Sequence, residues 1–332
     1  MIMKLEELAK LAGVSRTTAS YVLNGKAKEY RVSDRTIERV QALIDKYDFK
    51  PNAMAAGLRV GRSHTIGMII PDFANISYAQ IANLLENHCR EKGYQLLITC
   101  SNDKAHNEME CAKHLFQRQV DALIVSTCLP MENDFYLTHQ DVPVIGFDRR
   151  LHTEGVKNLL ANDVRDACHL GVNLLERQPY EKVLFFGAVP ELVVSKEREM
   201  GFREALQNTN TDIKDVHFLY ADEFKKDSAA VTFEAWLECH GLPDAIYTTS
   251  LTLLQGVLEI FLKKQKSIPE NVVFATFGKS ELVDLLANPV VCSVQNHRAI
   301  AQALFELAIP NKKAKTVVMP EKLIRQIYHY RW

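Results

Sequence analysis

The chain has 332 residues, of which 47% are hydrophobic, 24% charged and 8% aromatic. This is the composition of an ordinary globular protein, and it excludes collagen-like and disordered classes. The apolar stretches have the length of strands and fall short of the roughly 20 residues that span a bilayer. Acidic residues near the amino terminus argue against a signal peptide. We therefore expect a cytoplasmic protein without membrane contact, built from two domains with room for a small third one.

The distribution of charge and the spacing of the cysteines further limit the functional class of the protein. Residues 1–64 hold twelve basic and seven acidic residues, whereas the remaining 268 residues hold 28 basic and 34 acidic ones. A small basic unit joined to a mildly acidic body is typical of a tethered polyanion binder, although a solvated basic face would give the same counts. The seven cysteines show neither CxxC nor Cys/His spacing, so we expect free thiols, a reducing compartment and no metal site.

The first fifty residues predict three helices, and we assign residues 1–50 to a small all-α domain. Apolar residues recur at helical spacing up to Gly13, which ends the first run. Ser15 then stands at the N-cap of a second helix over 16–23, and Ser33 caps a third helix that ends near residue 47. Two short helices around a glycine-containing turn, followed by a longer helix, indicate a helix-turn-helix.

The segment LAGVSRTTASYVLNG is the strongest motif in the chain. Arg16, Thr17 and Tyr21 share one face of the second helix, where arginine can read a guanine edge and the hydroxyls can contact bases. The insert KAKEYR adds basic groups that suit phosphate contacts, with a solvated loop as the alternative. The predicted DNA-contacting residues of this domain are Ser15, Arg16, Thr17, Thr18, Tyr21, Asn24, Lys26, Lys28, Tyr30 and Arg31.

Residues 51–64 are weakly apolar and are interrupted by Gly57 and Gly61. A glycine inside a helix weakens it by about 1 kcal/mol relative to alanine. This segment therefore predicts a linker that becomes a short helix only when another surface stabilises it.

Beyond residue 64, strands alternate with helices, which favours an α/β body with parallel sheets covered on both faces. Strands are expected at 66–70, 95–99, 122–126, 144–147, 183–186, 216–219, 245–248 and 272–276, and helices at 78–92, 108–119, 164–176, 198–207, 229–239 and 253–264. The pattern splits near residue 163 into two lobes. The first lobe is expected at about 65–163 with a return near 293–318, and the second at about 164–292. Ligands of such folds bind where the strands end.

Several motifs occur here in the order found in one protein family. They are LAGVSRTTASYVLNG, KPNAMAAGLRVGRSHTIGMIIPD, QRQVDALIV, FDR at 147–149, REMGFR at 198–203 and ATFG at 275–278. The chain resembles the lac-repressor family of bacterial transcription regulators over its full length, and most closely the fructose-responsive members. The resemblance implies a two-lobed body like that of periplasmic binding proteins, a homodimer or homotetramer, and double-stranded operator DNA as partner. It also implies a hinge helix capped by Asn52, with Leu58 wedged into the minor groove beside Arg59.

The same resemblance implies an effector site between the lobes. In that family the position of Asp148 takes sugar hydroxyls, and the positions of Arg149 and Arg198 fix a hydroxyl or an anionic group. A plain salt bridge between the lobes is the alternative. Weaker candidates are Ser77, Tyr78 and Ser250. The implied effector is fructose 1-phosphate or fructose 1,6-bisphosphate, with no cofactor.

Lys279 marks a departure from the family, whose members usually carry one or two aspartates after the corresponding strand. Here Gly278-Lys279 follows it, which removes a hydroxyl acceptor and adds a cation. A lysine in a site that already contains two arginines would be self-repelling without an anion. We therefore predict that Lys279 lies within reach of the effector's phosphate, with a solvent-facing lysine as the alternative.

The function that these patterns favour is a DNA-binding repressor or activator of sugar and central carbon metabolism, released from operators by a phosphorylated fructose. The histidines are scattered without a paired nucleophile, and GxGxxG, the full P-loop motif GxxxxGK[ST] and HExxH are missing from the sequence, so we do not expect an enzyme. A regulator of the same family that answers another sugar or a purine is the alternative. A solute-binding protein of transport and a sugar-metabolising enzyme fit the sequence less well.

Overall fold

The computed structural model describes residues 3–49, 62–139, 141–209, 213–310 and 325–331. It separates into two compact units, Met1–Ser63 and His64–Trp332, each of which is described by itself. Within the described ranges, no helix combines the length and the apolar character that crossing a membrane requires.

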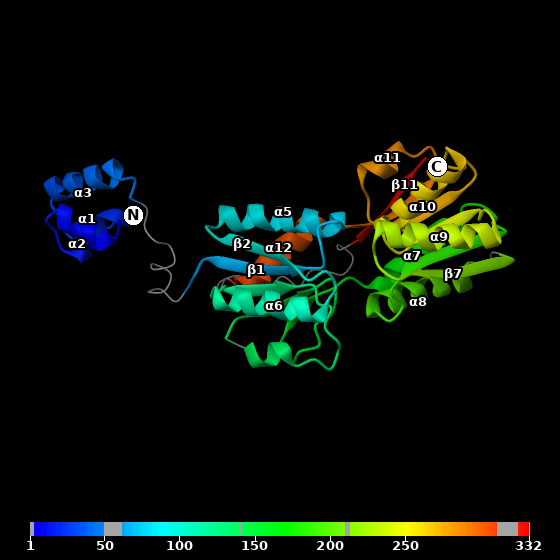
Figure 1. Ribbon diagram of the computed structural model, residues 1–332, viewed down its shortest axis with the longest axis horizontal. Helices are drawn as coiled ribbons and strands as arrows, with labels where there is room; N and C mark the ends of the chain where they lie inside the picture. Colours follow the sequence, from blue (N-terminus) through cyan, green and yellow to red (C-terminus); the bar gives the residue numbers. More distant parts are fainter. Residues whose placement is uncertain (1–2, 50–61, 140, 210–212, 311–324, 332) are drawn as a thin grey trace. The chain divides into compact units, whose positions relative to one another are not determined.

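The first unit contains α1 (Leu5–Leu11), α2 (Arg16–Leu23) and α3 (Asp34–Lys46) (Figure 1). Gly13 turns the chain between α1 and α2 with a φ of +60°, and the Ser15 hydroxyl accepts the backbone N–H of Thr18 at 3.1 Å. The predicted helix-turn-helix is confirmed. The cap predicted at Ser33 is correct in position only, because its hydroxyl bonds the Thr36 hydroxyl at 2.9 Å instead of a backbone N–H.

The first lobe of the second unit is built on a parallel sheet in the order β2-β1-β3-β4-β5. Its strands are β1 (Thr65–Ile70), β2 (Gln95–Cys100), β3 (Ala122–Val125), β4 (Val144–Phe147) and β5 (Lys157–Leu159). Helices α5 (Ile76–Glu91) and α12 (His297–Ala308) pack on one face, and α6 (Ala105–Gln117) packs on the other. Side chains alternate along β1, so Met68 lies under α5 and α12 while Ile69 lies under α6.

The second lobe is built on a sheet in the order β11-β10-β9-β8-β6-β7. Its strands are β6 (Lys182–Ala188), β7 (Asp215–Ala221), β8 (Ala245–Thr248), β9 (Val273–Phe277), β10 (Val290–Gln295) and β11 (Arg325–Tyr330). Helices α9 (Lys226–His240) and α10 (Leu251–Gln265) cover one face, α7 (Asp163–Leu175) and α8 (Val193–Asn208) cover the other, and α11 (Glu281–Leu285) follows β9. β11 runs antiparallel to β10, whereas the other paired strands are parallel.

The chain changes lobes after β5, after β10 and again before β11. Figure 1 shows the result: α12 lies with α5 in the first lobe, although it follows a strand of the second, and β11 lies in the second lobe. The predicted two-lobed α/β architecture is confirmed. The structure adds β5, β10, β11, α11 and α12 to the expected elements, and β11 returns to the second lobe beyond the boundaries expected for it.

Candidate functional site

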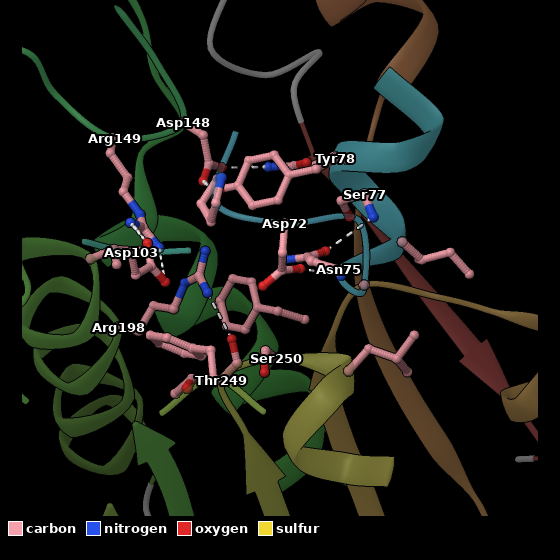
Figure 2. A pocket seen from close by; sticks show the side chains of 18 of the residues that line it. Asp72, Asn75, Ser77, Tyr78, Asp103, Asp148, Arg149, Arg198, Thr249 and Ser250 are labelled. Atoms are coloured by element: carbon pink, nitrogen blue, oxygen red, sulfur yellow. Dashed lines mark hydrogen bonds and ion pairs between the residues drawn. The ribbon is translucent and has the colours of Figure 1, made fainter. Parts of the chain in front are cut away.

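The ends of the strands of both lobes face a pocket (Figure 2). Six of the predicted effector residues line it: Ser77, Tyr78, Asp148, Arg149, Arg198 and Ser250. Parallel strands end at the same edge of a sheet, so residues that are distant in sequence meet there. The pocket is therefore the candidate ligand-binding site of this unit.

Asp148 is the central acceptor of the pocket. It follows the last residue of β4 and has a φ of +62°. Its Oδ2 accepts a hydrogen bond from the Tyr78 hydroxyl at 2.6 Å, and its Oδ1 accepts one from Nε2 of Gln295 at 3.2 Å. Burial would raise the pKa of Asp148, but the Tyr78 hydrogen bond and neighbouring arginines outweigh it and lower the pKa below the ordinary value. Asp148 is thus a carboxylate held ionised in a buried site.

Arg149 and Arg198, the two arginines predicted from the sequence, each pair with a carboxylate of their own lobe. The Arg149 guanidinium binds Asp103 of the β2–α6 loop. Arg198, near the start of α8, donates Nε to Asp163 and NH1 to the Thr249 carbonyl, both at 2.7 Å. The salt bridge between the lobes, which was the alternative interpretation, is not seen among the described residues: there, Arg149 and Arg198 each pair with a carboxylate of their own lobe.

A third arginine, Arg325, was missed by the sequence analysis. It opens β11, its side chain is 5% exposed, and it lies 3.5 Å from Asp166 and 3.8 Å from Asp163. The β10–β11 register pairs it with Gln295, so two residues that line the pocket stand side by side. Burial and the neighbouring Arg198 lower its pKa, although Asp163 opposes this shift. No local pattern in RQIYHY distinguishes this arginine from a surface residue.

The weaker candidates lie in the pocket with structural partners of their own. Ser77, in the first turn of α5, hydrogen-bonds His297 at 3.3 Å. Ser250 caps α10 by accepting the Leu253 backbone N–H at 3.3 Å. The sequence analysis also missed other lining residues, some of which follow strand ends that could have identified them; these are Asp72, Asn75, Asp103, Phe224, Thr249 and Gln295.

Lys279 stands apart from the other effector candidates. Gly278, with a φ of +91°, turns the chain after β9, and Lys279 is not among the residues that line the pocket. Its ammonium lies 3.5 Å from Asp284 of α11 and 4.7 Å from the centroid of the Tyr330 ring. These two partners satisfy the charge, so the lysine does not need the anion that we invoked for it.

The residues predicted to read bases lie on α2 of the first unit. Arg16 and Thr17 are exposed on α2, and Arg16 forms a weak pair with Glu6 at 3.6 Å. The ring of Tyr21 is stacked on that of Tyr30, with centroids 3.9 Å apart and planes within 3°. The insert is therefore packed against the helix that it follows.

The remaining predicted DNA residues fall into two groups. Lys26, Lys28 and Arg31 are exposed around the buried Ala27. Ser15, Thr18 and Asn24 form hydrogen bonds within the helix-turn-helix: the Ser15 hydroxyl accepts the Thr18 backbone N–H and bonds the Thr18 hydroxyl at 2.9 Å, and Asn24 Nδ2 donates to the Ser20 carbonyl at 2.8 Å. Asn52, Leu58 and Arg59 lie outside the described residues.

In the described part of the chain, no group of three or more His, Cys, Asp or Glu side chains lies where it could hold a metal ion. The buried Glu108 is fully engaged with Thr127, Cys128 and Tyr136 at 2.6–2.9 Å, so it stabilises the first lobe.

Comparison with known proteins identifies the family. Residues 4–52 match bacterial regulatory proteins of the lacI family, and residues 63–326 match the periplasmic binding proteins and sugar binding domain of the LacI family. The catabolite repressor/activator of Escherichia coli (strain K12) is 50% identical over 309 residues, which cover 92% of this chain and 91% of that protein. The fructose operon regulatory protein of Vibrio cholerae is 41% identical over 315 residues, or 94% and 95% of the two chains.

A solved structure agrees with these sequence matches. The Cra transcriptional dual regulator from Pseudomonas putida, in complex with fructose 1-phosphate, superposes with a TM-score of 0.68 at 37% identity, covering 74% of this chain and 90% of that one. Both units of the chain thus match one family, in the same order and over nearly the full length. The chain belongs to the lacI family of bacterial transcription regulators.

Proposed function

We propose that this regulator binds operator DNA through the first unit and is released from it by a phosphorylated fructose, with fructose 1-phosphate as the effector. The observation that carries the proposal is the pocket in which Asp148 and Tyr78 lie with three arginines. We further propose that the protein works in the cytoplasm as a homodimer or homotetramer and has no catalytic role.

The pocket has the chemistry that a sugar phosphate needs. Asp148 is ionised and can accept hydrogen bonds from sugar hydroxyls, while the guanidinium groups of Arg149, Arg198 and Arg325 present planar donors that match phosphate oxygens. A phosphate carries about −1.5 to −2 charges near neutral pH. The two most similar regulators named above are linked by their own names to catabolite control and fructose.

The pocket also suits a switch, because its lining comes from both lobes. Gln295 ends β10 of the second sheet, yet it donates to Asp148 at the end of β4 in the first sheet. A ligand that competes for Asp148 therefore acts on a contact between the lobes. By linkage, an effector that prefers the DNA-free arrangement weakens operator binding by the factor by which the operator weakens effector binding.

On the DNA side, we propose that Arg16, Thr17 and Tyr21 read bases and that Lys26, Lys28 and Arg31 contact phosphates. The first three lie on α2 and the others on the loop that follows it. We extend the proposal to a minor-groove contact by Leu58 of the 51–64 linker, with Asn52 and Arg59 beside it.

The test uses the full-length protein and a duplex selected by the protein from a random-sequence pool. Fluorescence anisotropy measures operator affinity while fructose 1-phosphate, fructose 1,6-bisphosphate, fructose and a purine are titrated separately. We expect fructose 1-phosphate to release the duplex and fructose to leave it bound. Asp148→Asn is expected to abolish the release, whereas Lys279→Ala serves as a matched control outside the pocket and keeps it. Binding of fructose 1-phosphate without a change in operator affinity would refute the regulatory role, and release by another ligand would replace the effector.

A further inference from the structure

The three arginines at the pocket differ in how firmly their carboxylate partners are held. Asp163, which binds Arg198, and Asp166, which lies beside Arg325, have side chains only 4% and 8% exposed. A buried carboxylate that leaves its cation pays the full cost of an unpaired buried charge. These two partners therefore stay in place when a ligand enters.

The partner of Arg149 is different. Asp103 lies on the short loop between β2 and α6, and its side chain is 39% exposed, whereas that of Arg149 is 12% exposed. Two of its contacts are with the same guanidinium: Oδ1 accepts NH1, and Oδ2 lies 3.4 Å from NH2 (Figure 2). Asp103 can turn toward water without becoming a buried unpaired charge, because its side chain is already partly exposed.

The charges that line the pocket determine which of the three arginines a phosphate can bind. Asp72, Asp103 and Asp148 all line the pocket together with Arg149, Arg198 and Arg325, and Asp163 and Asp166 lie just behind the arginines. A phosphate dianion that enters this site meets cations that already have anionic partners. Of the three pairs, only the one between Arg149 and Asp103 can exchange its carboxylate for phosphate at low cost.

We propose that Asp103 is a specificity-determining residue of the effector site: it holds Arg149 while the pocket is empty and competes with the phosphate of the effector for that arginine. The inference rests on the proposed function, because it takes a phosphorylated sugar as the ligand. The competition raises the effector concentration at which the regulator responds. It acts on phosphorylated ligands alone, since a neutral sugar has no group that replaces Asp103 on the guanidinium.

The experiment compares the full-length wild type with Asp103→Asn by calorimetric titration of fructose 1-phosphate, fructose and inorganic phosphate. Removing the competing charge is expected to tighten fructose 1-phosphate binding by about two- to fivefold, the range of a partly exposed ion pair. Binding of fructose should stay unchanged. Glu110→Gln is the matched control, because Glu110 is an exposed carboxylate paired with Lys113 on the neighbouring α6 and its loss changes net charge equally. Thermal unfolding of each variant reports whether the fold is intact.

A second comparison tests whether Asp103 affects fructose 1-phosphate binding through Arg149. In an Arg149→Ala background, Asp103→Asn is expected to change the affinity for fructose 1-phosphate by less than a factor of about two, because the contested cation is gone. Weaker or equal binding by Asp103→Asn would overturn the inference and make Asp103 a positioning or sugar-binding residue. Equal tightening of fructose and fructose 1-phosphate would overturn it as well. A wild type that binds no fructose 1-phosphate would instead refute the proposed effector, which separates the two failures.

Discussion

The stacked pair of Tyr21 and Tyr30 gives a sharp prediction about operator binding. Tyr21 lies on the exposed side of α2, and Tyr30 covers its ring from the insert, with centroids 3.9 Å apart and planes within 3°. Tyr30 itself is 48% exposed, so truncating it leaves the buried core of the unit untouched. In Tyr30→Ala the Tyr21 ring gains rotational freedom that DNA binding must remove.

The magnitude follows from the geometry of the pair. Stacked aromatic pairs contribute about 0.5–1.5 kcal/mol beyond the area that they bury. If that interaction fixes Tyr21 for recognition, its loss lowers operator affinity by about two- to twelvefold. Affinity for unrelated DNA depends on phosphate contacts and is expected to change less. The ratio of specific to nonspecific binding should therefore fall.

Fluorescence anisotropy with the selected operator and a scrambled duplex, at several salt concentrations, measures both affinities. Tyr30→Phe is the control, since it keeps the stacked ring and removes only the hydroxyl, and it should bind like the wild type. In a double-mutant cycle, Tyr30→Ala should add little to Tyr21→Ala because the two residues act as one unit. Additive losses would refute the reasoning, as would a Tyr30→Phe variant that binds as poorly as Tyr30→Ala.

Four further predictions concern single residues. Leu58→Ala should abolish operator binding while calorimetric unfolding of the second unit stays unchanged; parallel losses would make Leu58 a core residue. Arg325→Ala should lower the free energy of unfolding by about 3 kcal/mol in urea, because it strips buried carboxylates of a cation, and Arg325→Lys should restore stability more than fructose 1-phosphate binding. Gly201→Ala should cost about 3 kcal/mol in the same assay, since its Cβ would stand 2.1 Å from the Val164 carbonyl oxygen. Burial and the charge of Arg325 lower the pKa of His297 to about 4, so the stability that neutral His297 provides should be complete above pH 6.5, the ordinary value, and up to about 3 kcal/mol of it should be lost between pH 6.5 and 4. His297→Gln should flatten that part of the pH profile.

The helix-turn-helix could be predicted from the sequence because its signals are local. A glycine with positive φ, an N-cap serine that bonds the backbone three residues on, and apolar residues at helical spacing act within one or two turns. The same holds for the alternation of strands and helices in the body, and for Asp148 and Arg149, which stand directly at the end of a buried apolar strand.

The position of Arg325 in the pocket depends on strand pairing between segments that are distant in the sequence. Arg325 reaches the pocket only because β11 pairs antiparallel with β10 in a register that sets it opposite Gln295, after the chain has changed lobes twice more. β11 mixes exposed and half-buried residues at the edge of the sheet, so it has no run of apolar residues from which a strand could be predicted. The three-residue β5 gives an equally weak signal.

Lys279 shows the converse case, in which a correctly predicted strand end did not determine the direction of the side chain that follows it. The sequence determined that β9 ends in front of Gly278 and Lys279, at the edge where the ligand residues gather. Only the tertiary structure supplied Asp284 and Tyr330 as partners of its side chain. Which residues stand near a strand end is a local property, whereas the direction of a side chain past that end depends on the charges and rings that other segments bring beside it.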